Sequence, residues 1–261
     1  MRLNKKIASF PVSEKRLSYK QKIAMPLTWR TGTIIKVIEE TYNTRRYFIE
    51  VPELESFDFV AGQFVTIDCP IHEKPNKRWR SYSIASAPDG TNVYELLIVL
   101  VEDGQATPWM FDTWKVGTEI SFRGPAGVFT LKEEHLQQDL FLVCTGTGIA
   151  PFRSMVHWLL RENIPHKNIY LIYGCRTQKD LLYFEEMKNL GLEYFHYIPT
   201  LSREEWEGKT GYVHAIYEAY SQGKPHSNFF LCGWKNMIDE ARQRVVGMGF
   251  DKKAVHFELY G

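Results

Sequence analysis

The sequence has few cysteines, and they do not form the short pairs that mark metal sites. The chain of 261 residues contains four, Cys69, Cys144, Cys175 and Cys232, and none lie in a CxxC or CxxxxC pattern. Such pairs are typical of structural zinc sites and iron–sulfur clusters, and a dense cysteine framework is typical of small secreted domains. We therefore expect no disulfide scaffold, no bound metal and no fused iron–sulfur domain.

Long apolar runs and a strong net charge are absent as well. No run of about 18 apolar residues occurs, and the first residues lack the charged-then-apolar pattern of a secretory signal. The 32 Lys+Arg and 31 Asp+Glu residues give a formal net charge of +1, which argues against a nucleic-acid-binding protein. These absences predict a cytoplasmic globular protein without a membrane span. The sequence leaves its oligomeric state open.

Positive charge is concentrated at the start of the chain. Residues 1–30 contain eight basic side chains and one acid, Glu14, a net of +7, which leaves −6 for the rest of a chain whose total is +1. The segment has only weak periodicity, so we expect residues 1–29 to form a basic extension. It is a solvated arm, a docking arm for an acidic partner, or a transit peptide, since transit peptides are also poor in acids.

The next part of the chain shows a β pattern. Short runs rich in β-branched and aromatic residues are separated by Gly, Pro and Asn/Asp turns, at the spacing of a barrel or sandwich. The runs are residues 33–38, 47–51, 64–67, 83–85, 94–101 and 119–122. We predict an antiparallel β-barrel domain over residues 30–135.

After about residue 138, predicted strands alternate with predicted helices. The strands are residues 140–143, 169–173, 193–198, 229–232 and 254–259, and the helices are 151–161, 182–190, 213–220 and 236–247. This alternation is typical of a parallel sheet covered by helices on both faces. We predict a second, α/β domain over residues 136–261.

The motif Arg80-Ser81-Tyr82-Ser83 lies within the β half. An arginine offers a planar donor fork for a phosphate, and Tyr82, two residues on, shares its side of a strand and can stack on a flat ring. Ser83, on the opposite side, can donate one hydrogen bond. Taken alone, the motif also fits an ordinary strand with an exposed arginine.

The motif Gly104-Gln105-Ala106-Thr107-Pro108 predicts the start of a helix. Thr107 is a favourable N-cap and Pro108 suits the first helical position. The free N–H groups of a helix N-terminus bind anions, so this is a candidate phosphate site. A plain helix cap is the alternative.

Two further motifs follow predicted strands of the α/β half. Gly146-Thr147-Gly148-Ile149-Ala150-Pro151 joins a strand to a helix, the usual context for a pyrophosphate at a helix N-terminus. Cys232-Gly233-Trp234-Lys235-Asn236-Met237 joins another strand to another helix. The carboxyl ends of such strands line the ligand crevice of a parallel sheet, so Cys232 is either near that site or a small buried thiol.

In this order the motifs resemble ferredoxin–NADP reductase, most closely its plant-type branch. The matching segments are Arg80–Ser86, Gly104–Thr107, Gly124–Gly127, Gly146–Ser154, Ser202–Glu204, Cys232–Met237 and Glu258–Tyr260. The resemblance extends over roughly residues 30–261 and does not include residues 1–29. The resemblance implies two domains: an antiparallel FAD-binding β-barrel and a parallel-sheet, Rossmann-like NADP-binding domain.

The resemblance also implies how FAD is held. It assigns FAD contacts to Arg80, Tyr82, Ser83, Gly104, Gln105, Ala106, Thr107 and Tyr260. Arg80 and Thr107 hold the pyrophosphate, Tyr82 lies against one face of the isoalloxazine, and Ser83 hydrogen-bonds near flavin N5. Tyr260 covers the other face and must yield it to the nicotinamide. In this chain Gly261 follows Tyr260, whereas the family's tyrosine is terminal.

The implied NADP site occupies the α/β half. It comprises Thr145, Gly146, Thr147, Gly148, Pro151, Arg176, Ser202, Arg203, Lys209, Tyr212 and Cys232. The glycine turn binds the pyrophosphate, and the residues from Ser202 to Tyr212 meet the 2′-phosphate and adenine. Ser83, Cys232, Glu258 and Tyr260 form the implied catalytic set.

The function implied is an FAD-dependent oxidoreductase that exchanges electrons between NADP(H) and a separate acidic carrier, ferredoxin or flavodoxin. Hydride passes between nicotinamide C4 and flavin N5, and the flavin converts two-electron to one-electron transfer. Two alternatives stay open. One is an NADH-dependent reductase that feeds an oxygenase or cytochrome, and the other is a non-catalytic flavoprotein subunit.

Overall fold

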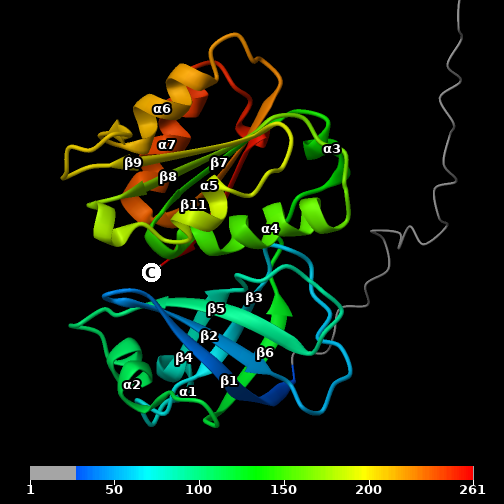
Figure 1. Cartoon of the computed structure of the whole chain (residues 1–261), viewed down its shortest axis with the longest axis vertical. Helices are drawn as coiled ribbons and strands as arrows, with labels where there is room; N and C mark the ends of the chain where they lie inside the picture. The colour runs from blue at the N-terminus through cyan, green and yellow to red at the C-terminus, as the bar shows by residue number, and fades with distance from the viewer. Residues whose placement is uncertain (1–27, 261) are drawn as a thin grey trace, which may run out of the picture.

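The computed structural model describes residues 28–260, which build two β-sheets, each with its own hydrophobic core (Figure 1). The basic extension predicted for residues 1–29 lies outside the described residues, apart from its last two, Thr28 and Trp29. The first strand already begins at Trp29. No helix among residues 28–260 is long and apolar enough to cross a membrane.

The first sheet is antiparallel and closes on itself. Its six strands are β1 (Trp29–Thr41), β2 (Thr44–Glu50), β3 (Phe64–Asp68), β4 (Trp79–Ser83), β5 (Val93–Val99) and β6 (Glu119–Ala126), in the order β4-β3-β6-β1-β2-β5. An isolated antiparallel bridge between Ile84 and Leu96 joins the two edge strands. The predicted antiparallel barrel is therefore confirmed. Two helices, α1 (Pro75–Arg78) and α2 (Ala106–Thr113), lie in its connections.

The barrel interior explains why these segments form strands. Alternate residues along β2, such as Tyr47 and Ile49, point into the core and are fully buried. They pack with Ile34, Tyr94 and Phe122 from other strands, so large aromatic and β-branched side chains fill the interior.

The second sheet is parallel throughout. Its strands are β7 (Asp139–Thr145), β8 (Ile169–Cys175), β9 (Phe195–Leu201), β10 (Lys209–Thr210), β11 (Ser227–Trp234) and β12 (Val255–Tyr260), in the order β10-β9-β8-β7-β11-β12. The helices are α3 (Glu133–Leu136), α4 (Ile149–Arg161), α5 (Phe184–Lys188), α6 (Val213–Tyr220) and α7 (Lys235–Gly247). Three short 3-10 turns, η1 (Gly146–Gly148), η2 (Gln178–Asp180) and η3 (Lys252–Ala254), complete the α/β half.

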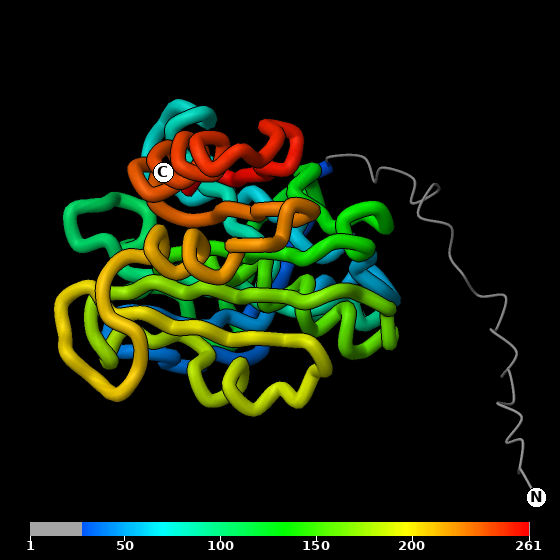
Figure 2. Tube along the Cα trace, turned by 90° about the horizontal axis from the view of Figure 1, so that it is seen from above, coloured from blue at the N-terminus to red at the C-terminus, as the bar shows by residue number. Residues whose placement is uncertain are grey.

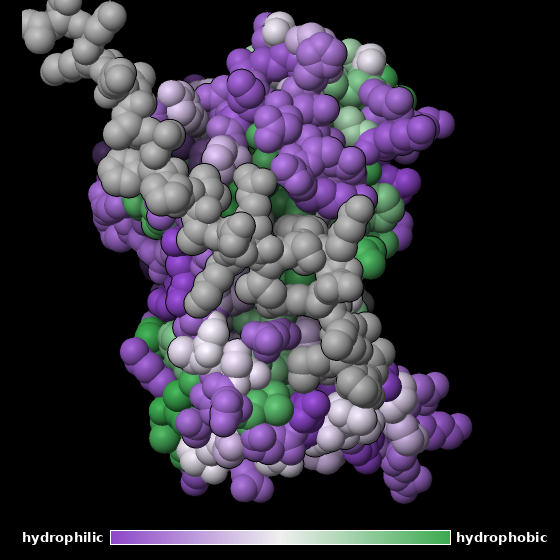
Figure 3. Space-filling view, turned by 90° about the vertical axis from the view of Figure 1, so that its right-hand side faces the viewer, coloured by the Kyte–Doolittle hydropathy of each residue, from purple (hydrophilic) through white to green (hydrophobic). Residues whose placement is uncertain are grey.

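Helices cover both faces of the parallel sheet, as predicted. α4 lies on the face toward the barrel, and α6 and α7 lie on the far face (Figure 1). Seen from above, the strands of this sheet run side by side, with the blue strands of the barrel behind them (Figure 2). On the face shown in Figure 3, hydrophilic side chains dominate the visible surface of the α/β half.

The strand order fixes where a ligand crevice opens. The chain runs from β7 outward through β8 to β9 and then returns to β11 on the other side of β7. In open parallel sheets the crevice lies outside the carboxyl ends of the strands at this reversal. Here those ends are Thr145 of β7 and Trp234 of β11.

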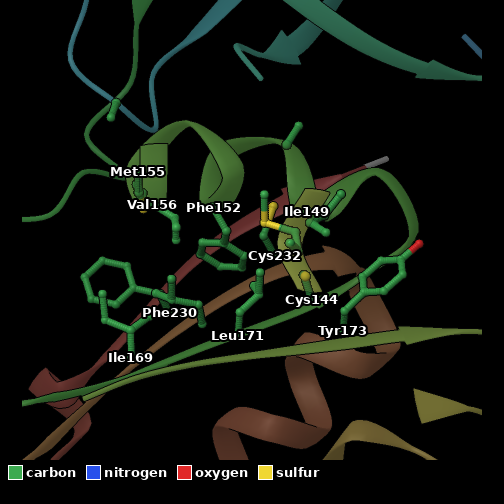
Figure 4. Close-up of a cluster of buried hydrophobic side chains, with 14 of the residues drawn as sticks. Cys144, Ile149, Phe152, Met155, Val156, Ile169, Leu171, Tyr173, Phe230 and Cys232 are labelled. Carbon is green, nitrogen blue, oxygen red and sulfur yellow. The ribbon is translucent and has the colours of Figure 1, made fainter. Parts of the chain in front are cut away.

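The face of the sheet toward α4 holds a continuous apolar cluster (Figure 4). Phe152 and Val156 of α4 pack over Leu171 and Phe230 of the strands, and all four are essentially inaccessible to solvent. The cluster extends to Cys232 at the end of β11. The helix that follows the glycine turn is therefore firmly seated on the strands that line the crevice.

Several predicted elements are longer in the structure, such as β1, which was expected over residues 33–38, and three others are shifted or shortened. The strand expected over residues 83–85 is β4, which ends at Ser83 rather than beginning there. The helix expected over 182–190 is confined to Phe184–Lys188, because Tyr183 takes a left-handed φ of 52° just before it. The strand expected over 193–198 is shifted to Phe195–Leu201.

The predicted cap at Thr107 is wrong. α2 begins at Ala106 with Gln105 as its N-cap, and no side chain caps it. The Thr107 hydroxyl instead accepts a 2.9 Å hydrogen bond from the backbone N–H of Val101. Thr107 lies in the first turn of α2 and therefore connects this turn to Val101, in the loop that follows β5.

Candidate functional site

The two halves of the chain meet at a hydrogen bond between Ser83 and Glu258. Ser83 ends β4 and is buried, and its hydroxyl donates to Oε2 of Glu258 in β12 at 2.7 Å. Burial raises the pKa of Glu258, and the Ser83 hydrogen bond acts in the opposite direction. The carboxyl group of Glu258, in the edge strand of the parallel sheet, thus contacts Ser83, the last residue of β4 in the barrel.

Cys232 lies beside this pair. In the parallel register it is opposite Glu258 on one side and Cys144 on the other. Its thiol is fully buried, and burial raises its pKa well above the ordinary value. The side chain is therefore a neutral thiol at neutral pH, small enough to leave room for a ring above it.

Tyr260 packs on the same side of the sheet as Cys232. Its hydroxyl oxygen is buried and forms no hydrogen bond within the described residues. Its pKa is raised well above the ordinary value, first by burial and then by the neighbouring Cys232 and Glu258. Tyr260 is therefore a packed residue of the site rather than a frayed one in solvent.

The glycine turn between β7 and α4 forms one wall. Gly146 has a φ of 54°, and a Cβ placed on it would meet no atom within 4 Å. Gly148 is the reverse, because a Cβ there would lie 2.4 Å from the backbone oxygen of Cys232. The turn therefore presses against β11 on one side and is open on the other. This open side, at the N-terminus of the 13-residue α4, has the room and the dipole that suit a pyrophosphate.

Two residues at the edge of the turn complete this wall. The Thr145 hydroxyl accepts a 3.3 Å hydrogen bond from the backbone of Trp234, which ties the ends of β7 and β11 together. Pro151 lies in the first turn of α4, where it lacks a backbone N–H and removes one donor from the anion site. Thr147 is half-buried within the turn between them.

On the barrel side, the structure brings β4 alongside α2. The Tyr82 hydroxyl lies 3.6 Å from the Met110 sulfur of that helix. Arg80 is half-buried; its Nη1 donates to the carbonyls of Lys77 at 3.0 Å and Trp79 at 2.8 Å, and no carboxylate of the described residues pairs with it. A half-buried guanidinium that has no carboxylate partner among the described residues fits a dinucleotide phosphate.

The loop before α2 contributes backbone rather than side chains. The N–H of Gly104 donates to Val101 at 2.9 Å, and Gln105 and Ala106 follow directly into the helix. Ala106 is buried and Gln105 is exposed. This arrangement fits the expected FAD pyrophosphate site, since short loops leave the first N–H groups of a helix accessible.

The remaining predicted residues form a separate group at the carboxyl ends of β8 and β9. The backbone N–H of Arg203 donates to the carbonyl of Arg176 at 2.9 Å, and the Ser202 hydroxyl donates to that of Cys175 at 3.2 Å. Lys209 lies in β10, and Tyr212, which is 74% exposed, precedes α6. None of the three cations in this group, Arg176, Arg203 and Lys209, has a carboxylate partner among the described residues.

One set of polar residues at the junction was not identified from the sequence. Arg153 of α4 and Glu95 of β5 are both buried and form an ion pair of 3.1 Å between the two halves. Arg153 stands within the segment Gly146–Ser154, but a charged residue in a helix usually marks a solvated face. Among residues 28–260, no group of three or more His, Cys, Asp or Glu side chains is placed to hold a metal ion.

Comparisons with known proteins find a matching domain family for each half of the chain. The model of the oxidoreductase FAD-binding domain matches residues 31–131, and that of the oxidoreductase NAD-binding domain matches residues 142–243. The chain is 34% identical over 227 residues to ferredoxin–NADP reductase B of Sorangium cellulosum, covering 83% of this chain and 91% of that protein.

Other relatives are reductase components. The chain is 28% identical over 245 residues to a glycine betaine monooxygenase reductase subunit of Pseudomonas aeruginosa, covering 90% of this chain and 66% of that protein. Among solved structures, the Amycolatopsis cytochrome P450 reductase GcoB superposes with a TM-score of 0.79 at 25% identity, covering 90% of this chain and 70% of that one. A ferredoxin NADP+ reductase from Neisseria gonorrhoeae superposes with a TM-score of 0.74 at 24% identity, covering 88% and 98%.

Proposed function

The chain belongs to the ferredoxin–NADP reductase family of FAD- and NAD-binding oxidoreductases, and from this premise we propose that it passes electrons between NADP(H) and a separate one-electron carrier, ferredoxin or flavodoxin. The observation that supports this most is the 2.7 Å hydrogen bond from Ser83 to Glu258. It joins the end of the flavin strand to the crevice at which the coenzyme binds.

Bound FAD supplies the exchange between two-electron transfer with the nicotinamide and one-electron transfer with the carrier. The chain's own groups bind and orient it. We assign the pyrophosphate to Arg80 and the start of α2, with Tyr82 stacked on one face of the flavin. Gly104, Gln105, Ala106 and Thr107 shape the loop that receives the phosphates.

We propose that Glu258 holds a proton and that Ser83 passes it to the reacting edge of the bound flavin. The Ser83 hydroxyl donates to Glu258 Oε2 and would also lie near flavin N5 once FAD is bound. Because burial raises the pKa of Glu258, this carboxyl group holds a proton closer to neutral pH than an exposed glutamate does. Cys232 leaves space for the nicotinamide ring, and Tyr260 excludes water from the flavin until the coenzyme displaces it.

The preference for NADP(H) over NAD(H) rests on the second group of residues. Arg176 and Arg203 at the carboxyl ends of β8 and β9, and Lys209 in the neighbouring β10, are cations that pair with no carboxylate of residues 28–260. A 2′-phosphate requires such charges, and the hydroxyls of Ser202 and Tyr212 add donors.

A second candidate is an NADH-dependent reductase that feeds an oxygenase. The observation in its favour is that several relatives are oxygenase reductase subunits, such as that of glycine betaine monooxygenase. The two candidates share the flavin site and differ in coenzyme and carrier.

The deciding experiment is anaerobic reduction of the purified, FAD-loaded protein. We expect the flavin to bleach with NADPH at a rate at least about tenfold above that with NADH, and the reduced protein to reduce ferredoxin or flavodoxin. A preference for NADH, with reduction of an oxygenase component instead, would favour the second candidate. A protein that binds FAD but is reduced by neither coenzyme would overturn both.

A further inference from the structure

Between the barrel and α4 lies a buried polar cluster that none of the site assignments uses. Its members are Arg46 of β2, Glu95 of β5, Arg153 of α4, Tyr183 just before α5 and Glu186 within α5. We call these five residues the junction cluster. It connects strands of the FAD-binding half to helices of the NAD-binding half, close to the turn that receives the coenzyme.

Glu95 is the centre of the junction cluster. It is 2% exposed, and its carboxylate accepts hydrogen bonds from three residues. Arg46 Nε donates to Oε1 at 2.7 Å and Arg153 Nη1 donates to Oε2 at 3.1 Å. The Tyr183 hydroxyl donates to Oε1 at 2.7 Å. One carboxylate of the barrel therefore holds two separate elements of the other half.

Arg153 uses its donor fork in three directions. It is 8% exposed, and besides Glu95 it donates from Nη1 to the backbone carbonyl of Ala85 at 2.9 Å. Its Nε and Nη2 donate to Glu186 at 2.5 and 3.1 Å. Lysine, a point charge on a flexible stem, cannot reproduce this planar arrangement.

Tyr183 is held in a conformation that its neighbours impose. Its φ of 52° is unusual for a bulky residue and needs support from its surroundings. The ring lies between the guanidinium groups of Arg46 and Arg153, 4.8 and 4.4 Å from its centroid. Its backbone N–H donates to Glu40 of the barrel at 2.6 Å.

The position of these contacts suggests what they control. Ala85 and Ser86 lie two and three residues after Ser83, and the Ser154 hydroxyl donates to the carbonyl of Ser86 at 2.6 Å. Arg153 and Ser154 belong to α4, which begins at the glycine turn. The contacts therefore fasten the chain segment beside flavin N5 to the helix whose N-terminus receives the coenzyme.

We infer that Arg153 is a positioning residue that sets how closely the nicotinamide approaches the flavin, an inference that rests on the proposed function. Buried ion pairs add little net stability, because desolvation offsets their attraction, whereas they do fix geometry. A reaction that needs its atoms about 3–3.5 Å apart is sensitive to small displacements between the two halves.

The test compares Arg153→Lys with Arg244→Lys in the full-length, FAD-loaded protein. Arg244 on α7 is a matched control, because it also bonds two glutamates, Glu218 and Glu240, but on the far face of the sheet. We expect Arg153→Lys to slow flavin reduction by saturating NADPH at least about tenfold. It should also weaken the charge-transfer absorbance that NADP+ gives with the reduced protein.

Other readouts separate positioning from general stability. Coenzyme dissociation constants should stay within about twofold, because the backbone that binds the pyrophosphate moves with α4. The control should change none of these values. An Arg153→Lys protein with wild-type reduction rate and absorbance, whatever its melting temperature, would overturn the inference.

A milder variant keeps the test decisive if Arg153→Lys does not fold. Tyr183→Phe keeps the ring between the two guanidinium groups and removes only the hydroxyl donor to Glu95. We expect about threefold slower reduction with unchanged FAD content. If this variant is as fast as the wild type, the inference fails. If the wild type itself is not reduced by either coenzyme, the proposed function fails instead.

Discussion

Ser83 donates a 2.7 Å hydrogen bond to Glu258, a residue 175 positions further along the chain. The bond brings the end of a barrel strand to the edge strand of the parallel sheet, and Cys232 is aligned with Glu258 on the neighbouring strand. A flavin ring bound at β4 and a nicotinamide bound at the glycine turn would therefore share this corner. The predictions below test the groups that surround it.

Arg80 should govern FAD affinity. A charge-assisted phosphate contact is worth about 1.5–3 kcal/mol, so Arg80→Ala should weaken FAD binding by about ten- to a hundredfold. Arg80→Lys should restore it only in part, since lysine lacks the fork. Titration of the apoprotein with FAD measures the dissociation constant. An unchanged value would mean that Arg80 only braces the backbone of Lys77 and Trp79, as its hydrogen bonds already do.

Arg203 should discriminate between the two coenzymes. Its side chain has no carboxylate partner within residues 28–260, and it lies beside Arg176. Arg203→Ala should weaken the use of NADPH at least about tenfold and leave NADH nearly unaffected, because only NADPH carries the 2′-phosphate. Steady-state kcat/KM for both coenzymes provides the measurement. Equal losses with the two would instead assign Arg203 to the fold or to the shared pyrophosphate.

The buried carboxyl group of Glu258 should lower the stability of the protein at neutral pH, although the reaction requires it. Its pKa is raised from the ordinary 4.5, so the folded state binds this proton more tightly than the unfolded chain does. The stability that this proton contributes is complete below the unfolded pKa and is lost as the pH rises through the raised value. Glu258→Gln has no charge to bury. As the pH rises from about 4 to about 8, the wild type should lose stability relative to this variant, so the difference in their free energies of unfolding should shift in favour of Glu258→Gln.

The same variant should slow flavin reduction, since glutamine supplies no proton to Ser83. Denaturant unfolding across that pH range, with Glu119→Gln on the exposed face of β6 as control, tests the stability part. A constant difference between Glu258→Gln and the wild type at every pH would contradict it.

Glu186 should stabilise the protein at neutral pH, which is the opposite of the effect expected for Glu258. Its burial would raise its pKa, but hydrogen bonds from His157 and Arg153 outweigh burial and lower the pKa from 4.5 to about 2. A lowered carboxyl pKa contributes stability that is present above the unfolded value and is lost as the pH falls toward about 2. Glu186→Gln should therefore be less stable than the wild type at neutral pH, by at most about 3 kcal/mol, and this difference should shrink in acid.

Melting temperatures between about pH 7 and about pH 3 measure that difference, with Glu185→Gln on the same helix as the matched control. The control should show little dependence on pH. If Glu186→Gln and Glu185→Gln behave alike, the bonds of Glu186 to Arg153 and His157 do not contribute to stability.

The local parts of the site could be predicted from the sequence, and the resemblance already groups Ser83 with Glu258. The junction cluster between the two halves could not be predicted. Strand, glycine turn and helix follow one another over Leu140–Arg161, so periodicity and turn chemistry suffice there. Arg153 and Glu95 are 58 positions apart, one in a helix and the other in a strand. Neither the helical periodicity around Arg153 nor the strand pattern around Glu95 indicates that these two charged side chains are buried. The short α5 has a similar cause, since the left-handed Tyr183 depends on contacts with the barrel.

Tyr260 should control coenzyme preference by opposing the weaker ligand. Its ring packs in the same cluster as Cys232, and its hydroxyl is buried without a hydrogen bond in the described part of the chain. We propose that this ring covers the face of the flavin that the nicotinamide needs. Stacking of an aromatic ring on the flavin contributes about 0.5–1.5 kcal/mol beyond burial, and the coenzyme must overcome it. NADPH is anchored by its 2′-phosphate and can displace the ring, whereas NADH lacks the anchor.

Tyr260→Ser should therefore raise the apparent affinity for both coenzymes and favour NADH proportionally more. The charge-transfer absorbance formed by NADP+ with the reduced protein should increase, because the nicotinamide then stacks without competition. Tyr260→Phe is the matched control: it keeps the ring and removes only the unpaired hydroxyl, so it should retain the wild-type preference. If Tyr260→Ser leaves the ratio of NADPH to NADH use and the flavin fluorescence unchanged, Tyr260 does not cover the flavin and its role as a lid is excluded.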